Sequence, residues 1–434
     1  MTLTERLSSF ALDDCQNDAA LRMMRLSLLD WAACGCAAVA EPAAVLTRQM
    51  VESDAGTPEA SVLGGAWLPA RSAALVNGVT SHALDYDDTH FAHIGHPSVA
   101  VIPAALAVAE RTGASGEAFL QACLAGVEAS IRIGVWLGRG HYQIGYHQTG
   151  TAGCFGATIA AGRLLGCDAG QLGHAIGLAS TRAAGLKSQF GTMGKPYNAG
   201  AAAAAGVEVA LLAEAGFVSN PDAISGPLGF GETHHGAEHA EAFEGLGQRW
   251  LFEQISHKFH ACCHGTHAMI EALRSLECSD VAEIVVRTHP RWLSVCDKPN
   301  PTTGLEAKFS YRFIAAMVLL GHDTARPDSF SDALVREPVL CALRDKVRVA
   351  GDESLPETAT HVTVRAAGGK TWTAEHDIAD PLAVPLREAK LRKKVEALLS
   401  QDAAELIQAV LGGTQVDLAA LGTCLRHSLS ESGV

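Results

Sequence analysis

Four short segments of the sequence concentrate histidine, lysine, aspartate and tyrosine immediately ahead of stretches rich in alanine and glycine. They are residues 82–98, 145–150, 191–198 and 257–267. Side chains of these types transfer protons or bind anions, and the apolar stretches that follow have the spacing of helices. A helix N-terminus offers unpaired N–H groups and the positive end of the helix dipole, which suit a carboxylate or a phosphate. The pattern predicts an anion site that carries its own acid–base groups.

The charge balance of the chain makes a local cluster of cations necessary. The 434 residues have a formal net charge of −14, which opposes binding of nucleic acid and of any other anion by the molecule as a whole. Lys195 and Lys258 are the cations within the four segments that could act against this field. Pro97 and Pro196 suit the first turn of a helix, which supports the placement of these segments at helix N-termini.

Each of these residues also has an ordinary structural interpretation. Asp85 and the aspartates next to it could be helix caps or solvated acids, His147 could be a structural histidine, and Lys195 could be a surface lysine. The repetition of the same pattern in four segments, each followed by an apolar helix, favours a functional site over these separate explanations.

Two sets of residues have the types of side chain that bind zinc. The first is His90, His93 and His96, where Gly95 and Pro97 interrupt the regular helix that would align the three rings. The second set lacks a recognised spacing and consists of His257, His260, Cys262, Cys263, His264 and His267. The sequence has no nucleophile elbow, Walker loop or dinucleotide fingerprint. We therefore expect neither a metal nor an organic cofactor, with a metal-dependent hydrolase as an alternative.

Helical periodicity dominates the first 270 residues, and strand patterns are almost absent there. The expected helices are 18–38, 70–84, 98–111, 115–137, 150–165, 170–184, 199–215 and 264–275. After about residue 278 the pattern changes. Residues 281–288 alternate as in a strand, and residues 361–374 read as a β-hairpin around Gly368-Gly369. Further helices are expected at 307–320, 331–343 and 386–411.

These elements predict a mainly α protein with an α+β second domain. The helical domain comprises residues 1–265 and 392–434, and the α+β domain comprises residues 266–391. The 12 cysteines contain no CxxC pair, the N-terminus lacks an apolar signal segment, and charged residues interrupt the apolar stretches. We therefore expect a cytoplasmic protein with reduced thiols and without a membrane span.

The motifs taken together resemble those of the MmgE/PrpD family. The run His82-Ala-Leu-Asp85-Tyr-Asp-Asp-Thr89, followed by His96-Pro-Ser, is similar to the family's HxxDxDDT…HPS signature. Residues 194–196, 258–267 and 307–313 are similar to further family segments. The resemblance runs through most of the chain and includes the order of helical and α+β segments.

Members of this family include 2-methylcitrate dehydratase, cis-aconitate decarboxylase and iminodisuccinate epimerase. The resemblance implies a helical domain interrupted by an α+β lid domain, an active site between the two, a homodimer, and no obligatory cofactor. It implies a small anionic polycarboxylate as substrate. The candidate catalytic residues are Tyr146, His147, His96, Lys308 and Asp85. The candidate substrate-binding residues are Thr89, Lys195, Lys258 and His267.

The shared chemistry of the family is removal of a proton α to a carboxylate, which requires a base and cations that stabilise the developing charge. Tyr146, with His147 beside it, and Lys308 offer acid–base groups on separate segments, which favours an iminodisuccinate epimerase-like isomerase. A 2-methylcitrate dehydratase-like hydro-lyase, a cis-aconitate decarboxylase-like lyase and an inactive interaction protein are the alternatives. The decarboxylase is disfavoured because Cys263 stands where that enzyme has a histidine, and because His96 lies one residue farther from Thr89.

Overall fold

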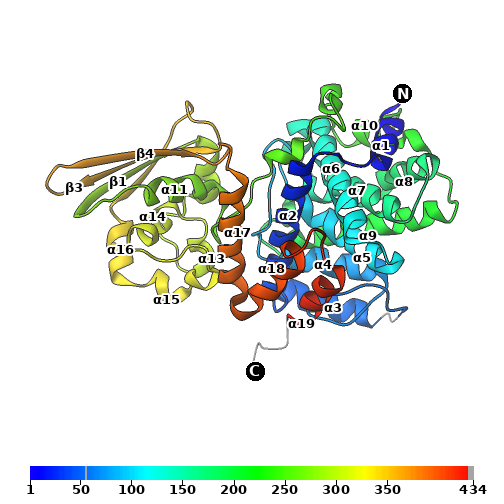
Figure 1. Cartoon of the computed structure of the whole chain (residues 1–434). Coiled ribbons are helices and arrows are strands. Elements are labelled where there is room, and N and C mark those ends of the chain that lie inside the picture. The colour runs from blue at the N-terminus through cyan, green and yellow to red at the C-terminus, as the bar shows by residue number, and fades with distance from the viewer. Residues whose placement is uncertain (54–55, 429–434) are drawn as a thin grey trace. The chain divides into compact units, whose positions relative to one another are not determined.

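The computed structural model describes residues 1–53 and 56–428 and divides into two compact units (Figure 1). Unit 1 contains Met1–His257 and the chain from Leu399 onward, and unit 2 contains Lys258–Leu398. The predicted divisions at 265/266 and 391/392 both fall inside unit 2. Residues just after 257 join unit 2 because the Ala261 and Cys263 N–H groups donate to carbonyl groups of Thr324 and Lys308. The mainly α architecture with an α+β second part is confirmed.

Unit 1 is built from helices. Its α-helices are α1 (Leu3–Leu12), α2 (Asp18–Ala37), α3 (Pro42–Glu52), α4 (Ala70–His82), α5 (Ser98–Thr112), α6 (Gly116–Ile144), α7 (Gln148–Leu164), α8 (Ala169–Arg182), α9 (Gly194–Glu214), α10 (Phe230–Thr233), α18 (Ala403–Leu411) and α19 (Leu418–His427). Its short 3₁₀ helices are η1 (Lys187–Gln189), η2 (Pro221–Ala223), η3 (Ala240–Phe243), η4 (Leu251–Gln254) and η8 (Ser400–Asp402). The seven long helices expected in this part of the chain are all present. Helices α1, α3 and α19 were not predicted.

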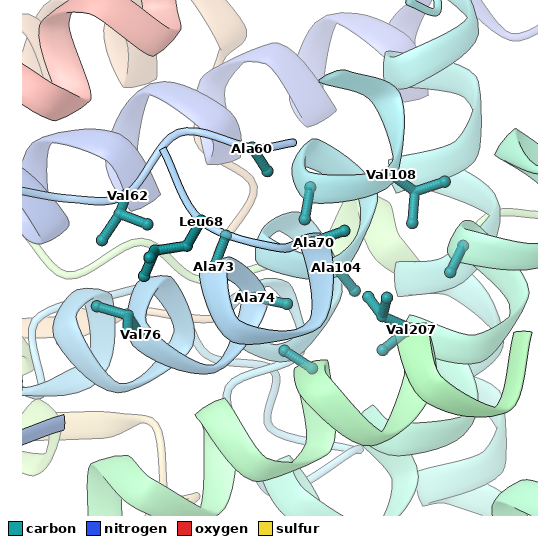
Figure 2. Close-up of a cluster of buried hydrophobic side chains, with 14 of the residues drawn as sticks. Ala60, Val62, Leu68, Ala70, Ala73, Ala74, Val76, Ala104, Val108 and Val207 are labelled. Atoms are coloured by element: carbon teal, nitrogen blue, oxygen red, sulfur yellow. The ribbon is translucent and has the colours of Figure 1, made fainter. Parts of the chain in front are cut away.

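Small side chains pack the centre of unit 1. Ala73 of α4, Ala104 of α5 and Val207 of α9 belong to one buried cluster (Figure 2). Helices α4 and α9 cross very closely at Gly78 and Gly200. A Cβ added at Gly78 would lie only 2.7 Å from the Cα of Gly200, so glycine permits this crossing. This crossing lets the start of α9 approach the end of α4, and two of the four polar segments lie at these ends.

Helix α6 is the one described helix long and apolar enough to cross a membrane, although α2 and α3 together pass the same test as a bent pair. The sequence pattern did not predict this property. Some 78% of the most apolar window of α6 is buried inside the protein, as is usual for a core helix. Gly138, with a φ of +74°, interrupts its helical geometry, which explains why the expected helix ended at residue 137.

Unit 2 contains a four-stranded mixed sheet in the order β2–β1–β3–β4. The strands are β1 (Val281–Thr288), β2 (Val347–Gly351), β3 (Ala359–Ala366) and β4 (Thr371–Asp377). β1 is parallel to β2 and antiparallel to β3, which is antiparallel to β4. The predicted strand 281–288 and the hairpin are confirmed, whereas β2 was not predicted.

Helices cover this sheet, with α11 against β3 and β4 and α14 against β2. The buried side chains of the strands alternate along the chain, as in Ile284 and Val286 of β1 and Val362 and Val364 of β3. The α-helices of unit 2 are α11 (His267–Arg274), α12 (Leu293–Cys296), α13 (Gly304–Ala307), α14 (Tyr311–Leu319), α15 (Asp332–Val335), α16 (Pro338–Arg344) and α17 (Val384–Leu399). Its 3₁₀ helices are η5 (His264–Thr266), η6 (Pro290–Trp292) and η7 (Pro327–Ser329).

Candidate active site

Three of the four polar segments converge in unit 1, each at the start of a helix. The first follows α4 and leads into α5, the second leads into α7, and the third contains the first turn of α9. The Lys195 ammonium nitrogen lies 2.7 Å from Oδ1 of Asp85. The His82 ring centroid lies 4.6 Å from that of His96 and 6.1 Å from that of His147. The fourth segment belongs to unit 2 from Lys258 onward.

The imidazole of His96 lies between two carboxylates. Its Nδ1 is 3.0 Å from Oδ2 of Asp87, and its Nε2 is 3.2 Å from Oδ1 of Asp85. A ring nitrogen and a carboxylate oxygen at this separation repel each other unless the nitrogen carries a proton. Because Asp87 is the buried partner, we assign a lasting proton to Nδ1. Nε2, on the side of the more exposed Asp85, is then the nitrogen that can gain or lose a proton.

Asp87 is the fixed anion of this group. Its Oδ1 also lies 2.9 Å from Nδ1 of His82. Burial acts to raise the pKa of the Asp87 carboxyl, but the neighbouring imidazoles of His82 and His96 outweigh this effect and hold the pKa well below its usual range. Burial in turn lowers the pKa of His82. Asp87 therefore orients both rings while it stays ionised.

Asp85 holds the more accessible end of the group. Its backbone has a φ of +52°, in the left-handed region that aspartate tolerates better than most residues. Its side chain is 41% exposed, compared with 2% for Asp87. The side chain of Lys195, at the second position of α9, is 15% exposed. The Asp85–Lys195 ion pair is thus the part of the group that an incoming anion can reach.

His147 is a neutral imidazole whose tautomer is set by a neighbouring amide. Nδ2 of Asn198 lies 3.3 Å from the carbonyl oxygen of Leu186 and 3.1 Å from Nδ1 of His147. The carbonyl accepts only from an N–H donor, so this orientation of the amide also donates to Nδ1, and the ring proton is on Nε2. Burial, followed by the positive charge of Lys195, lowers the pKa of His147 well below its usual range. His147 can therefore donate a hydrogen bond without being charged.

Two predicted site residues of unit 1 make other contacts. The Tyr146 ring stacks on His141, with centroids 4.5 Å apart and planes at 2°, and lies 5.1 Å from the ring of His234. Thr89 pairs through its backbone with Ser256, and its hydroxyl donates to the Ser256 carbonyl at 3.4 Å. The structure thus brings together Asp85, His96, His147 and Lys195 from the predicted set, and places the Tyr146 ring against different histidines.

Unit 2 contains the remaining predicted residues, Lys258, His267 and Lys308. Burial, followed by the neighbouring histidines and the buried Lys258, lowers the pKa of His267 well below its usual range. The Lys308 carbonyl accepts a hydrogen bond of 2.9 Å from the Cys263 N–H. The charges of both lysines also act on the thiol of Cys262. Lys258 and Lys308 thus place positive charge near the Cys262 thiol within unit 2, and His267 is a neutral imidazole.

Four side chains of the unit 1 group could also hold a metal ion. Their potential ligand atoms all lie within 4.8 Å of one another and come from His82, Asp85, Asp87 and His96. This set shares only His96 with the His90, His93 and His96 set that the sequence offered as an alternative, and His90 Nε2 instead lies 3.0 Å from the Leu251 carbonyl oxygen. The ammonium group of Lys195, 2.7 Å from Asp85, already provides a cation for one of the four ligands.

The candidate set from the sequence omitted three residues that the geometry makes important. His82 and Asp87 lie inside the aspartate-rich motif, so their types were visible although their roles were not. Asn198 follows Lys195 by three residues, which is one turn of α9, but its contact with His147 depends on the packing of α9 against α7.

Comparison with known proteins matches most of the chain to one family. Residues 2–242 match the model of the MmgE/PrpD N-terminal domain, and residues 260–411 match that of the MmgE/PrpD C-terminal domain. The human cis-aconitate decarboxylase is 28% identical, over 78% of this chain and 75% of its own length. The cis-aconitate decarboxylase of Aspergillus terreus is 26% identical, over 90% of this chain and 87% of its own.

A cis-aconitate decarboxylase-like protein of Aspergillus oryzae is 30% identical, over 58% of this chain and 56% of its own length. These relatives support an enzyme of the lyase type. The two domain models cover most of the sequence in the expected order, and the predicted resemblance is confirmed. The chain belongs to the MmgE/PrpD family.

Proposed function

We propose that the chain is a lyase that acts on a small di- or tricarboxylate by acid–base chemistry, without a metal or organic cofactor. The observation that carries this proposal is the position of His96 between Asp85 and Asp87, with Lys195 at the accessible end. This arrangement combines a proton-transfer group, a fixed anion that orients it and a cation for the substrate.

Lys195 binds one carboxylate of the substrate. Its ion pair with Asp85 is partly exposed, so a substrate carboxylate can take the place of Asp85 as the partner of the ammonium group. His147 then donates its Nε2 proton in a hydrogen bond to a substrate oxygen. Because the imidazole is neutral, its strongest contribution is to the negative charge that develops on this oxygen during the reaction.

His96 transfers the proton. In a decarboxylation, the C–C bond to one carboxylate breaks, CO₂ leaves, and the electron pair is delocalised toward a second carboxyl group. Protonated Nε2 of His96 then donates its proton to the carbon and is reprotonated from solvent. In a dehydration, neutral Nε2 removes the proton α to the carboxylate, and the hydroxyl group accepts this proton from the His96 imidazolium and leaves as water. Asp87 stabilises the imidazolium in both cases.

Decarboxylation is the first candidate within this class, because the three relatives carry the names of decarboxylases or similar proteins. The presence of Cys263 where the decarboxylase has a histidine favours a different reaction. Dehydration is the most similar alternative reaction. The predicted epimerase depends on Tyr146 and Lys308 as paired groups. The stacking of Tyr146 on His141 weakens this interpretation, because it gives the phenol different neighbours from those of His96.

A panel of three substrates tests the proposal. The purified protein is incubated with cis-aconitate, 2-methylcitrate or iminodisuccinate in D₂O, and the products are followed by NMR. We expect loss of CO₂ or of water from one substrate, with solvent deuterium on the product carbon if CO₂ leaves. Exchange of the α-proton without elimination would establish the isomerase instead. Absence of reaction with all three would count against a polycarboxylate lyase.

A further inference from the structure

We propose that Cys263 and Cys296 of unit 2 form a reversible disulfide when the protein meets a hydroperoxide. The two residues are far apart in the sequence and lie on different elements. Cys263 directly precedes η5, and Cys296 is the last residue of α12. The two cysteines belong to unit 2, whereas the group around His96 belongs to unit 1.

The geometry brings the two sulfur atoms together before any bond exists. Neither cysteine forms a disulfide in the structure, and Sγ of Cys296 lies 3.0 Å from Sγ of Cys263. A disulfide bond is about 2.05 Å long, so bond formation requires the sulfur atoms to approach by about 1 Å. A change in side-chain torsion can move a sulfur atom by this distance.

Burial and hydrogen bonding assign different roles to the two thiols. Cys263 is partly exposed, whereas Cys296 is fully buried. Cys296 donates its S–H to the sulfur of Cys263, and this hydrogen bond, together with burial, raises the pKa of Cys296 well above its usual range. The positive charges of Lys258 and Lys308 act on this group of thiols. Cys263 is therefore the sulfur that an oxidant reaches, and Cys296 is the thiol that then forms the disulfide with it.

The reaction balances with hydrogen peroxide as the oxidant. The sulfur of Cys263 attacks one peroxide oxygen, the O–O bond breaks, and water leaves, which gives a sulfenic acid at Cys263. The sulfur of Cys296 then attacks the sulfenic sulfur, the S–O bond breaks, and a second water leaves with the Cys296 proton. Two thiols and one peroxide thus give one disulfide and two molecules of water.

The adjacent Cys262 is a poorer participant. Its sulfur lies 3.1 Å from the hydroxyl oxygen of Thr266, and burial raises its pKa to about 12. Cys262 is also buried, whereas Cys263 is partly exposed, so the oxidant reaches Cys263 first.

Peptide mapping under non-reducing conditions tests the proposal. The reduced protein is treated with hydrogen peroxide, blocked with an alkylating reagent and digested with trypsin. Cleavage places Cys263 in the peptide 259–274 and Cys296 in the peptide 292–308. We expect these two peptides as one cross-linked species that dithiothreitol separates. Because the free thiol of Cys263 should disappear first, we expect its loss to be at least about tenfold faster than that of Cys278.

Variants identify the sulfur atoms and keep the result independent of catalytic activity. Cys263→Ser and Cys296→Ser should each abolish the cross-link, with the Cys296→Ser protein accumulating sulfinic acid at Cys263. Cys262→Ser and Cys278→Ser, as matched controls, should retain it. A wild-type protein that gives sulfinic acid at Cys263 without the cross-link would overturn the proposal. A cross-link that survives Cys263→Ser would also overturn it, because Cys262 would then be the partner.

Discussion

Asp88 is a buried carboxyl group of unit 1 that should make the stability of the protein depend on pH. The residue is 1% exposed, and the Ser98 hydroxyl donates to its Oδ2 at 2.6 Å. Burial raises the pKa of Asp88 to about 7, and the neighbouring carboxyl of Asp30 acts in the same direction while Ser98 opposes it. Replacement of Asp88 by asparagine keeps the shape and an acceptor for Ser98 but removes the ionisation.

The size of the effect follows from the difference between the folded and unfolded pKa values. The folded protein binds this proton more tightly than the unfolded chain, whose carboxyl has a pKa of 3.8. The full stability is therefore present below about pH 4 and is lost as the pH rises toward about 7. At about 1.4 kcal/mol per pKa unit, the contribution of Asp88 should fall by about 2–3 kcal/mol between pH 5 and pH 8.

Urea unfolding followed by circular dichroism at pH 5 and pH 8 measures this loss. We expect Asp88→Asn to gain about 2–3 kcal/mol relative to the wild type between pH 5 and pH 8. Glu244→Gln, which replaces an exposed carboxylate of the same unit, should have the same free energy of unfolding as the wild type at both pH values. If Asp88→Asn and the wild type changed in parallel with pH, Asp88 would titrate alike in the folded and unfolded states, and its assignment as a buried, destabilised carboxylate would be wrong.

Three further predictions concern the site and assume a substrate found with the panel above. Lys195→Ala should lose about 1.5–3 kcal/mol of transition-state binding, or about 10- to 150-fold in kcat/KM, whereas Lys370→Ala should leave kcat/KM unchanged. Wild-type kinetics in the Lys195 variant would show that this lysine does not bind substrate. Activity should survive exhaustive dialysis against EDTA, and loss that Zn²⁺ reverses would instead make His82, Asp85, Asp87 and His96 metal ligands. Tyr146→Phe should change turnover less than about threefold if the phenol only packs on His141. A selective block of α-proton exchange in one stereoisomer, measured in D₂O, would restore the two-base epimerase.

Most of the fold could be predicted in segments whose apolar residues follow either helical spacing or the alternation of a strand. Helix α5 begins with a long apolar run, α4 carries Ala, Leu and Val at helical spacing, and the hairpin has alternating strands around Gly368-Gly369. β2 was missed because the strand is short and only Val347 in it is buried. Its sequence therefore lacks a clear alternation of buried and exposed residues. The extension of α6 was missed because Gly138 interrupts the helix in the middle of a longer element.

The site could be predicted in its residue types but not in all of its contacts. The sequence places His147 and Lys195 at the starts of predicted helices. The close crossing of α4 and α9 at Gly78 and Gly200 lets Lys195 reach Asp85. The pairing of His147 with Asn198 depends on how α7 and α9 pack, and so has no signature in the spacing of residues. The stacking of Tyr146 on His141 also depends on tertiary packing. Neighbouring side chains of an extended segment point to opposite sides, so Tyr146 need not share the contacts of His147.

The most direct test of the central claim is the rate of product formation by His96→Gln. The variant keeps polar atoms near Asp85 and Asp87 but has no group that exchanges a proton near neutral pH. We expect its turnover to fall by a factor of about 10² or more, with an unchanged circular dichroism spectrum, while a control variant, His322→Gln, remains at the wild-type rate. Turnover of His96→Gln at the wild-type rate would contradict the account, because His96 would then not transfer the proton.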